Sequence, residues 1–572
     1  MNTAFLNFRF HTLSFFALST FCLVSANALP TFSRQTEQPC SVCHLNVGEL
    51  THEGRKFKLM GYTAGKNVLP LSITATGSVT KIKSTSSSIA PDIFLAKNDQ
   101  PIAEDVSLYA AGKYFENMGG YLKWTLSLAN TNPIYGSSGV QTGTKVGQDA
   151  FLDTSEVRIA NQSTIGGHGV AWGFSVNNAP GVQDLWSTTP GFSFPYRTST
   201  LQSAWGMGQF GPTSLIDGGL SSQVIGLSAF TMIDDTLYLE LTDYRRSQPG
   251  WGTISTTGPN LNSISSGDNP YWRIAWNKVQ DENSYMFGTF GMNSHLLRDP
   301  LVVGSASGTY FDYGFDAQFQ HITSTHSLST QATLIYEDVN WGPRSVGKSH
   351  DNPNSNLVTL KSKVTYDYAR KYGVSVFEFS SKGTVDNLYW SYNQNPNVIT
   401  GACNQQTSLL TYCSANGSPN TSGSGFELYY DPIPYIHIVF QQTYYQTFLG
   451  GGTFVDNSAG QPRNASDNNL SYFYILLTYL MNSSEIYSSL IDLLKNKFEV
   501  SIEKITPTST LSELGLDSLS LMEFVFAAED AFSIRIAEED LDPRQIGTTL
   551  SDISNIIERM VAIRQASSKK EI

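Results

Sequence analysis

Long stretches of the chain alternate apolar and polar residues, and this alternation constrains the fold more than any other feature. From Thr309 to Gln320 the apolar residues take one set of alternate positions, and Asp312, Asp316 and Gln318 lie in the other. Successive side chains of a strand point to opposite faces, so such a strand has an apolar face and a polar face. The pattern recurs from about residue 67 to residue 480 and predicts a mainly β fold, a transmembrane β-barrel of about 16 strands.

The connections and the composition favour the same fold. Short turns at 116–120 and 233–236 contrast with long links rich in Gly, Ser, Asn and Pro at 180–221 and 382–425. Charged residues make up only 15% of the chain, against roughly 25% in ordinary soluble domains, and aromatic residues reach 12%. We expect most charges on the polar face to be solvated in the lumen. Steering of ions, or contact with the segment that precedes the barrel, is the alternative. A soluble β-sandwich or solenoid is the alternative, and it would bury its apolar face against itself.

The N-terminus predicts a secretory signal peptide at residues 1–28. Arg9 supplies the positive region, residues 13–24 form a short apolar core, and Ala26-Asn27-Ala28 is a small-residue cleavage site. An uncleaved anchor is the alternative. Cleavage after Ala28 would place the chain beyond the inner membrane, an oxidising compartment in which disulfides form.

Two cysteines lie in a Gly-, Ser- and Asn-rich segment that resembles a long exposed loop. We expect Cys403 and Cys413 to form a disulfide that staples this loop, because the compartment is oxidising. Two free thiols or two metal ligands are the other possibilities.

The segment 29–66 contains the motif of covalent c-type haem attachment. Cys40-Ser41-Val42-Cys43-His44 follows the C-x-x-C-H pattern. Two thiols at this spacing can form thioethers with the two vinyl groups of one porphyrin, and the adjacent His becomes the proximal iron ligand. A redox C-x-x-C or half a zinc site is the alternative, but no second Cys pair lies at zinc-finger spacing.

The second axial ligand of the haem iron is less well defined by the sequence. Met60 and His52 are the nearest candidates, and an open position is the third possibility. Met60 is attractive because His/Met ligation raises the reduction potential. A Met near an aromatic ring can equally well be a packing residue.

The N-terminal segment resembles the fused monohaem cytochrome–porin proteins of iron-oxidising bacteria. The similarity rests on Arg34-Gln35-Thr36, the haem motif, Glu49-Leu50-Thr51, and Gly54-Arg55-x-Phe57-Lys58 with Gly61-Tyr62. The resemblance implies an outer-membrane protein in which a haem segment plugs or caps the barrel and passes electrons inward. It also implies ferrous iron as a candidate extracellular donor and periplasmic electron-transfer proteins as partners.

After Leu480 the alternation stops and helical spacing begins, with Ile486, Leu490, Leu493, Leu494 and Val500 as an apolar stripe. Residues 481–572 resemble acyl carrier proteins through Leu514-Gly515-Leu516-Asp517-Ser518-Leu519. The resemblance implies an all-α four-helix bundle with 4'-phosphopantetheine on Ser518 at the start of a helix. A Ser that merely caps a helix is the alternative.

Further positions in this domain follow from the helical pattern. Leu519, Met522 and Phe526 are expected in its core, and Glu523, Glu529 and Asp530 on an acidic face toward partner enzymes. These partners are a phosphopantetheinyl transferase and acyl-transfer enzymes.

The sequence therefore predicts an electron-transfer barrel in outer-membrane lipid joined to an acyl-carrier domain, and no enzyme active site. The net charge of −13 argues against a nucleic-acid partner. The two halves call for different compartments. The barrel is expected in the bacterial outer membrane, and the carrier domain would be periplasmic if the fusion is real and cytoplasmic if it is a separate protein. No Gly/Ser/Pro-rich linker lies between the last predicted strand, which ends at Leu480, and the helical domain that begins at Met481. The alternative is thus an acyl carrier protein joined by gene fusion or reading error to a passive porin.

Overall fold

The computed structural model describes residues 30–557, with short gaps and with longer ones at 84–97, 189–210, 247–266, 298–306, 343–349, 392–411 and 533–548. The chain divides into two compact units, Met1–Thr478 and Tyr479–Ile572. The predicted signal peptide at residues 1–28 lies outside the described residues. Within the described part, no helix is long and apolar enough to cross a lipid bilayer.

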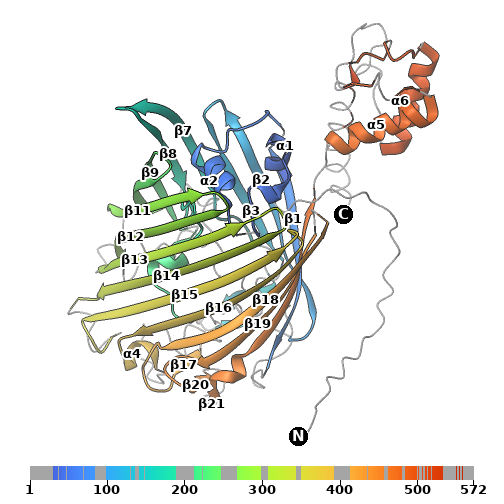
Figure 1. Cartoon of the computed structure of the whole chain (residues 1–572). Coiled ribbons are helices and arrows are strands. Elements are labelled where there is room, and N and C mark those ends of the chain that lie inside the picture. The colour runs from blue at the N-terminus through green and yellow to red at the C-terminus, as the bar shows by residue number, and fades with distance from the viewer. Residues whose placement is uncertain are drawn as a thin grey trace. The chain divides into compact units, whose positions relative to one another are not determined.

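The first unit is a closed antiparallel β-barrel (Figure 1). Both β6 and β7 pair with β3, so they are two parts of one wall strand, and the described barrel has 16 strands. The predicted barrel of about 16 strands is confirmed. Its strands are β1 Leu71–Ile82, β2 Pro101–Phe115, β3 Met118–Ser127, β6 Asp149–Leu152, β7 Glu156–Ile165, β8 His168–Asn177, β9 Val224–Ile233, β10 Leu237–Arg246, β11 Asn269–Gln280, β12 Asn283–Leu297, β13 Ser307–Ile322, β14 His326–Asn340, β15 Asn354–Tyr368, β16 Tyr372–Gly383, β18 Thr421–Ile433, β19 Ile436–Thr447 and β22 Leu470–Tyr479.

The last strand closes the barrel by pairing with β1 on one side and with β19 on the other. The connections at one end are tight turns, as in β9–β10, where Asp234 and Asp235 take positive φ values of 50° and 56°. We call this the short-turn end. The chain enters β1 and leaves β22 at this end, since Leu477 of β22 pairs with Ile436 at the start of β19.

The two faces of the strands differ as the alternation predicts. On β13, Phe311 and Phe315 are 46% and 55% exposed on the outer wall, whereas Asp312 on the alternate face is fully buried. The return strand β14 repeats this, with Ser329 and Gln331 buried and Leu328 exposed. Large apolar side chains are exposed on most of the wall strands, including β1, β8, β12 and β16.

The lumen differs from the solvated interior that the sequence predicts. Charged lumen residues such as Arg158, Arg273 and Asp316 are at most 5% exposed. The reason is that chain segments that are not wall strands fill the lumen. Two of them are the N-terminal segment and residues 178–188, between β8 and β9.

Shorter elements lie at both ends of the barrel. Figure 1 shows α1 and α2 at one end, and α4 with β20 and β21 at the other. These elements are α1 Pro30–Thr36, the 3₁₀ turn η1 Cys40–Val42, α2 His52–Leu59, the helical turn η2 Leu215–Gly219, α4 Asn387–Trp390, the 3₁₀ turn η4 Ala465–Asn468, the hairpin β4 Thr131–Tyr135 with β5 Gln141–Val146, and the small sheet of β17 Tyr412–Ser414, β20 Thr453–Asp456 and β21 Gln461–Asn464.

The second unit is helical, with α5 Ser483–Phe498 and α6 Ser518–Phe532. Its core joins α5, α6 and the segment around residues 550–557. The buried members are Leu490, Leu494, Val500, Leu511, Leu514, Phe524, Ala528, Leu550, Ile553 and Ile557. The predicted helical carrier bundle is confirmed. The short helix predicted near residues 537–541 lies outside the described residues.

Candidate functional sites

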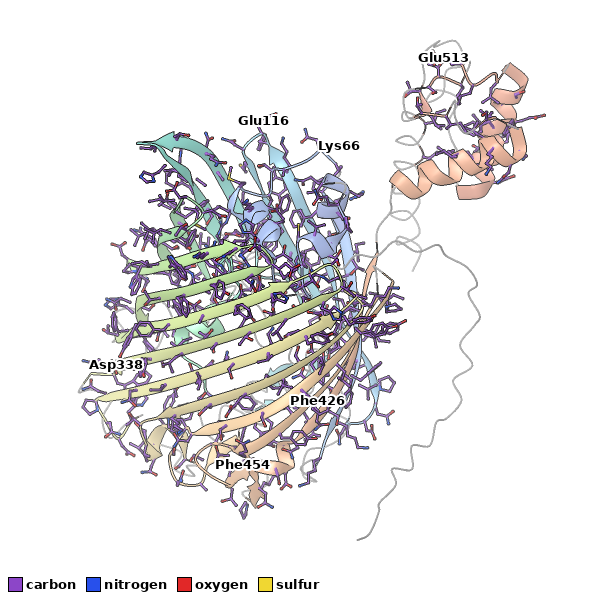
Figure 2. All side chains as sticks on the ribbon, in the orientation of Figure 1. Lys66, Glu116, Asp338, Phe426, Phe454 and Glu513 are labelled. Atoms are coloured by element: carbon purple, nitrogen blue, oxygen red, sulfur yellow. The ribbon has the colours of Figure 1, made fainter. Side chains whose placement is uncertain are left out.

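The N-terminal segment is fixed inside the short-turn end of the barrel by buried polar contacts. Figure 2 labels Lys66 and Glu116 at this end. Arg55 of α2 donates to Ser284 Oγ at 2.6 Å and to Gln320 Oε1 at 2.8 Å. Glu49 forms an ion pair with Lys363 of β15, and both side chains are buried. A buried ion pair of this kind is costly to break, because one charge would be left without a partner.

The wall of the barrel is shaped to receive this segment. A Cβ on Gly119 of β3 would lie 2.6 Å from the carbonyl oxygen of Gly61 and 2.5 Å from that of Gly112. Next to it, Tyr62 donates its hydroxyl hydrogen bond to Glu156 Oε2 at 2.8 Å. The N-terminal segment therefore packs directly onto the backbone of β3, and no side chain larger than that of glycine fits at position 119.

The residues of the haem motif lie on one tight turn. The amides of Cys43 and His44 both donate to the carbonyl of Cys40, at 3.0 and 2.8 Å. The turn packs against α2 at Gly54, where a Cβ would lie 2.2 Å from the Cys43 carbonyl oxygen. Arg370, in the β15–β16 turn, donates to the His44 carbonyl at 3.5 Å. The motif is therefore near the short-turn end.

Two thiols and an imidazole at this spacing are the donor set that covalent haem requires. Cys40 and Cys43 are free thiols, and burial raises the pKa of Cys40 to about 12 and also raises that of Cys43. Burial lowers the pKa of His44 to about 4, so its imidazole is neutral at neutral pH and can ligate a metal. Its Nδ1 is buried with no hydrogen bond to the described residues.

The two candidate axial ligands lie at opposite ends of α2. His52 Nε2 is 3.3 Å from Asp235 Oδ2, in the β9–β10 turn. Met60, at the C-terminal end, packs against an apolar cluster that contains Leu59 and Trp186. Each side chain thus has a partner in the barrel, and the identity of the sixth ligand stays a prediction.

The predicted exposed loop around the second cysteine pair is exposed at Ala415 and Asn416, but the part that carries Cys413 is buried. Cys413 is disulfide-bonded and 0% exposed, and it lies on β17, which pairs with β20. Packing of the small sheet against the barrel end explains why a Gly- and Ser-rich sequence is not solvated here. Cys403 lies outside the described residues, so the Cys403–Cys413 pairing stays a prediction.

The carrier domain presents Ser518 as the first residue of α6. The preceding turn is closed by two backbone hydrogen bonds, from Leu514 to Thr510 at 3.2 Å and from Leu516 to Leu511 at 3.2 Å. Buried Leu511 and Leu514 anchor this turn in the core. A helix N-terminus offers unpaired amides and a positive dipole, which favour an attached phosphate.

Three expectations about α6 were wrong. Met522 and Phe526 are 37% and 52% exposed, whereas the core uses Phe524 and Ala528. Glu529, expected on the acidic face, is 7% exposed. The apolar positions of α6 are spread around the helix, and packing against α5, where Phe498 contacts Phe524 edge to face, selects the buried face.

Sequence reasoning missed the lumen residues that hold the N-terminal segment. Lys58 and Arg55 occur in the stretch that carries the cytochrome–porin resemblance, so that stretch was the available signal. Asp184 and Trp186 lie in a link with no periodic pattern, and nothing in the sequence distinguishes them from loop residues.

Comparisons with known proteins match the second unit to one family. Residues 488–557 match the family described as "Phosphopantetheine attachment site". The acyl carrier protein of Chlorobium phaeovibrioides is 32% identical over 80 residues, which cover 14% of this chain and 100% of that protein. A putative mitochondrial acyl carrier protein of Schizosaccharomyces pombe is 46% identical over 54 residues, 9% of this chain. The chain spans about half the length of that protein, 48%, and 52% of the mitochondrial acyl carrier protein of Dictyostelium discoideum.

Solved structures similar to the barrel cover 72% of the chain. They include OprB of Pseudomonas putida at high pH, with a TM-score of 0.38, 12% identity and 94% of that chain covered. The anion-selective porin from Comamonas acidovorans has a TM-score of 0.36, 9% identity and 99% of its chain covered.

Proposed function

The chain belongs, through the domain that follows the barrel, to the acyl carrier protein family, and we propose that Ser518 carries 4'-phosphopantetheine. The family match spans Ser518, and the domain's core and helix α6 support the proposal. The phosphopantetheine thiol would hold acyl groups as thioesters. A phosphopantetheinyl transferase and acyl-transfer enzymes would be its partners.

Mass spectrometry of the full chain tests this. After coexpression with a phosphopantetheinyl transferase, the tryptic peptide that contains Ser518 should gain the mass of one phosphopantetheine arm. Ser518→Ala should remove the gain, and Ser520→Ala, two residues further along the same helix, should keep it. An unmodified wild-type peptide, or modification that persists in Ser518→Ala, would refute the assignment.

For the first unit, we propose a location in the bacterial outer membrane. Apolar side chains exposed around the closed wall, such as Phe287, Phe315 and Val376, are the supporting observation. Such a wall is stable in lipid because the closed sheet leaves no unpaired strand edge. Fractionation should recover the chain with outer membranes, and its electrophoretic mobility should change on heating. Recovery in the soluble fraction would contradict the location.

We also propose that the N-terminal segment is a c-type haem site. Cys40 and Cys43 would form the thioethers and His44 would be the proximal ligand; the free thiols and the neutral imidazole support this. When bound, the haem supplies one-electron transfer. The contacts of Glu49 and Arg55 with the barrel hold the segment, and with it the turn that carries the three ligands, in one position.

Haem staining of denatured protein tests the attachment. Wild-type protein made with the cytochrome c maturation system should stain, and Cys40→Ala/Cys43→Ala should not. Cys403→Ala/Cys413→Ala is the matched control and should stain like wild type. Failure of the wild type to stain would exclude covalent haem.

The place of the motif supports a proposal for the direction of electron flow. Short turns of outer-membrane barrels face the periplasm. The motif lies near that end, so we propose that electrons leave toward periplasmic electron-transfer proteins. The cytochrome–porin resemblance suggests an extracellular donor, with ferrous iron as the candidate. Reduction of the haem in intact cells by a membrane-impermeant donor tests this direction.

The second candidate function treats the acyl carrier as a separate protein and the barrel as a passive porin. The unit boundary near residue 479, directly before Met481, favours it. Channel conductance without haem reduction, and a free carrier peptide in the cytosol, would support this reading.

A further inference from the structure

Residues 178–188, which we call the strap, cross the lumen between β8 and β9. The strap residues Val182, Leu185 and Trp186 are 0% exposed. Gln318 of β13 and Gln331 of β14 each donate to the Trp186 carbonyl at 3.1 Å. On the other side, Arg158 of β7 donates to the Gln183 carbonyl at 2.5 Å. The strap therefore links β7 to the pair β13 and β14 on another part of the wall, and neither of these two strands is a neighbour of β7.

The strap also holds the N-terminal segment. Lys58 of α2 donates from Nζ to the carbonyls of Val182 and Asp184, at 2.6 and 2.8 Å. Leu59 packs in the same apolar cluster as Leu185 and Trp186. Two segments from outside the wall thus contact each other within the lumen, and we call this contact the joint.

Charges around the joint are balanced only when both segments are present. Among the residues that the structure describes, eight buried Arg, Lys, Asp and Glu side chains gather there, four cationic and four acidic. They are Arg55, Lys58, Arg158 and Arg273, with Glu156, Asp184, Glu240 and Asp316.

The N-terminal segment supplies two of the four cations. Without Arg55 and Lys58, two cations on the wall would face four carboxylates from the wall and the strap. Buried charges that lack partners are strongly destabilising, so the strap and α2 stabilise each other in place. A lumen with excess carboxylates would attract cations.

We propose that the strap and α2 form a two-part gate that keeps the lumen closed to ions, and that breaking the joint opens a cation-selective pore. The gate rests on the proposed membrane location of the barrel, and it is independent of the haem and of the carrier domain. Its function would be to let the barrel hold the N-terminal segment in the membrane without leaking ions.

Single-channel recording in planar lipid bilayers tests the gate with the full-length chain. Wild-type protein should be silent. Lys58→Met removes one cation and both hydrogen bonds to the strap, so it should give openings whose reversal potential in a salt gradient shifts toward the cation equilibrium. Lys56→Met is the matched control, because Lys56 lies on the same helix and is exposed. This variant should stay silent.

Membrane insertion is measured separately, by liposome flotation and heat-modifiable mobility. A wild type that fails to insert would count against the membrane location, whereas variants shown to insert test the gate itself. Thr333→Val is the second variant, because Thr333 donates to the Thr188 carbonyl at the far end of the strap at 2.6 Å. It should also give openings. A conducting wild type, anion-selective openings, or silence of both inserted variants would overturn the proposal.

Discussion

Lys58 shows how one residue couples charge to position. The residue is 2% exposed, and burial lowers the pKa of its ammonium to about 8 although the negative charge of Glu156 raises it. Two carbonyls accept hydrogen bonds from it, and the Glu156 carboxylate forms an ion pair with it at 3.9 Å. Lysine is thus used as a compact point charge that can fill a small polar space between the strap and the wall.

The depressed pKa of Lys58 predicts a stability change with the sign opposite to that of an ordinary ion pair. Between about pH 8 and the free value of 10.5, the unfolded chain binds more protons at this site than the folded chain. The contribution of Lys58 to the free energy of unfolding should therefore rise with pH in this window. Urea unfolding of wild type and Lys58→Met across the window should show the difference between them growing. A constant difference would contradict the buried environment.

A second residue-scale prediction concerns Gly119. A methyl group there would press on the backbone carbonyls of Gly61 and Gly112, at 2.6 and 2.5 Å. Gly119→Ala should destabilise the barrel by about 1–3 kcal/mol, the usual cost of overpacking, and should loosen the N-terminal segment. Limited proteolysis of that segment measures the loosening. Gly77→Ala is the control, because its nearest atom would be at an ordinary 3.7 Å.

Among the elements, α6 buries one of two phenylalanines that have equivalent surroundings in the sequence and exposes the other. Phe524 is fully buried and stacks edge to face on Phe498 at 5.7 Å, whereas Phe526 is 52% exposed. Met522 is one turn from Phe526 and is exposed as well. The two positions form an apolar strip on the same face as Ser518 by helical spacing.

Substitution of these two phenylalanines should therefore have unequal effects. Phe524→Ala should destabilise the carrier domain by about 3–5 kcal/mol, because it opens a cavity in the core. Phe526→Ala should change stability little. Thermal unfolding of the full chain, followed through the helical signal of the carrier domain, compares them. Equal losses would mean that the helix is packed on a different face.

The barrel strands show a similar division between pattern and packing. Alternation in β13 correctly predicts that Phe315 faces outward and Asp316 faces inward. It does not predict the partners of Asp316, which accepts a hydrogen bond from Arg273 at 2.7 Å and pairs with Thr188 of the strap.

At the scale of the whole molecule, the central question is whether the barrel and the carrier are one chain in the cell. Trypsin should release residues 464–495 as a single peptide, since no Lys or Arg lies between Arg463 and Lys495. We expect this peptide in the outer-membrane fraction if the fusion is real. A cytosolic peptide that begins at Met481 or Asn482 would instead indicate two proteins, and the carrier would then work in the cytoplasm.

The sequence alone determined the barrel and the motifs of haem attachment and of acyl carrier proteins, because each depends on local spacing. Alternation defines the faces of a strand, and the Cys40–His44 and Asp517–Leu519 patterns are short motifs. Only the tertiary structure decided that the lumen is filled, since contacts such as Lys58 to Asp184 join residues more than a hundred positions apart. The same holds for the choice of Phe524 over Phe526, because a helix with apolar residues on several faces buries the one that its neighbours cover.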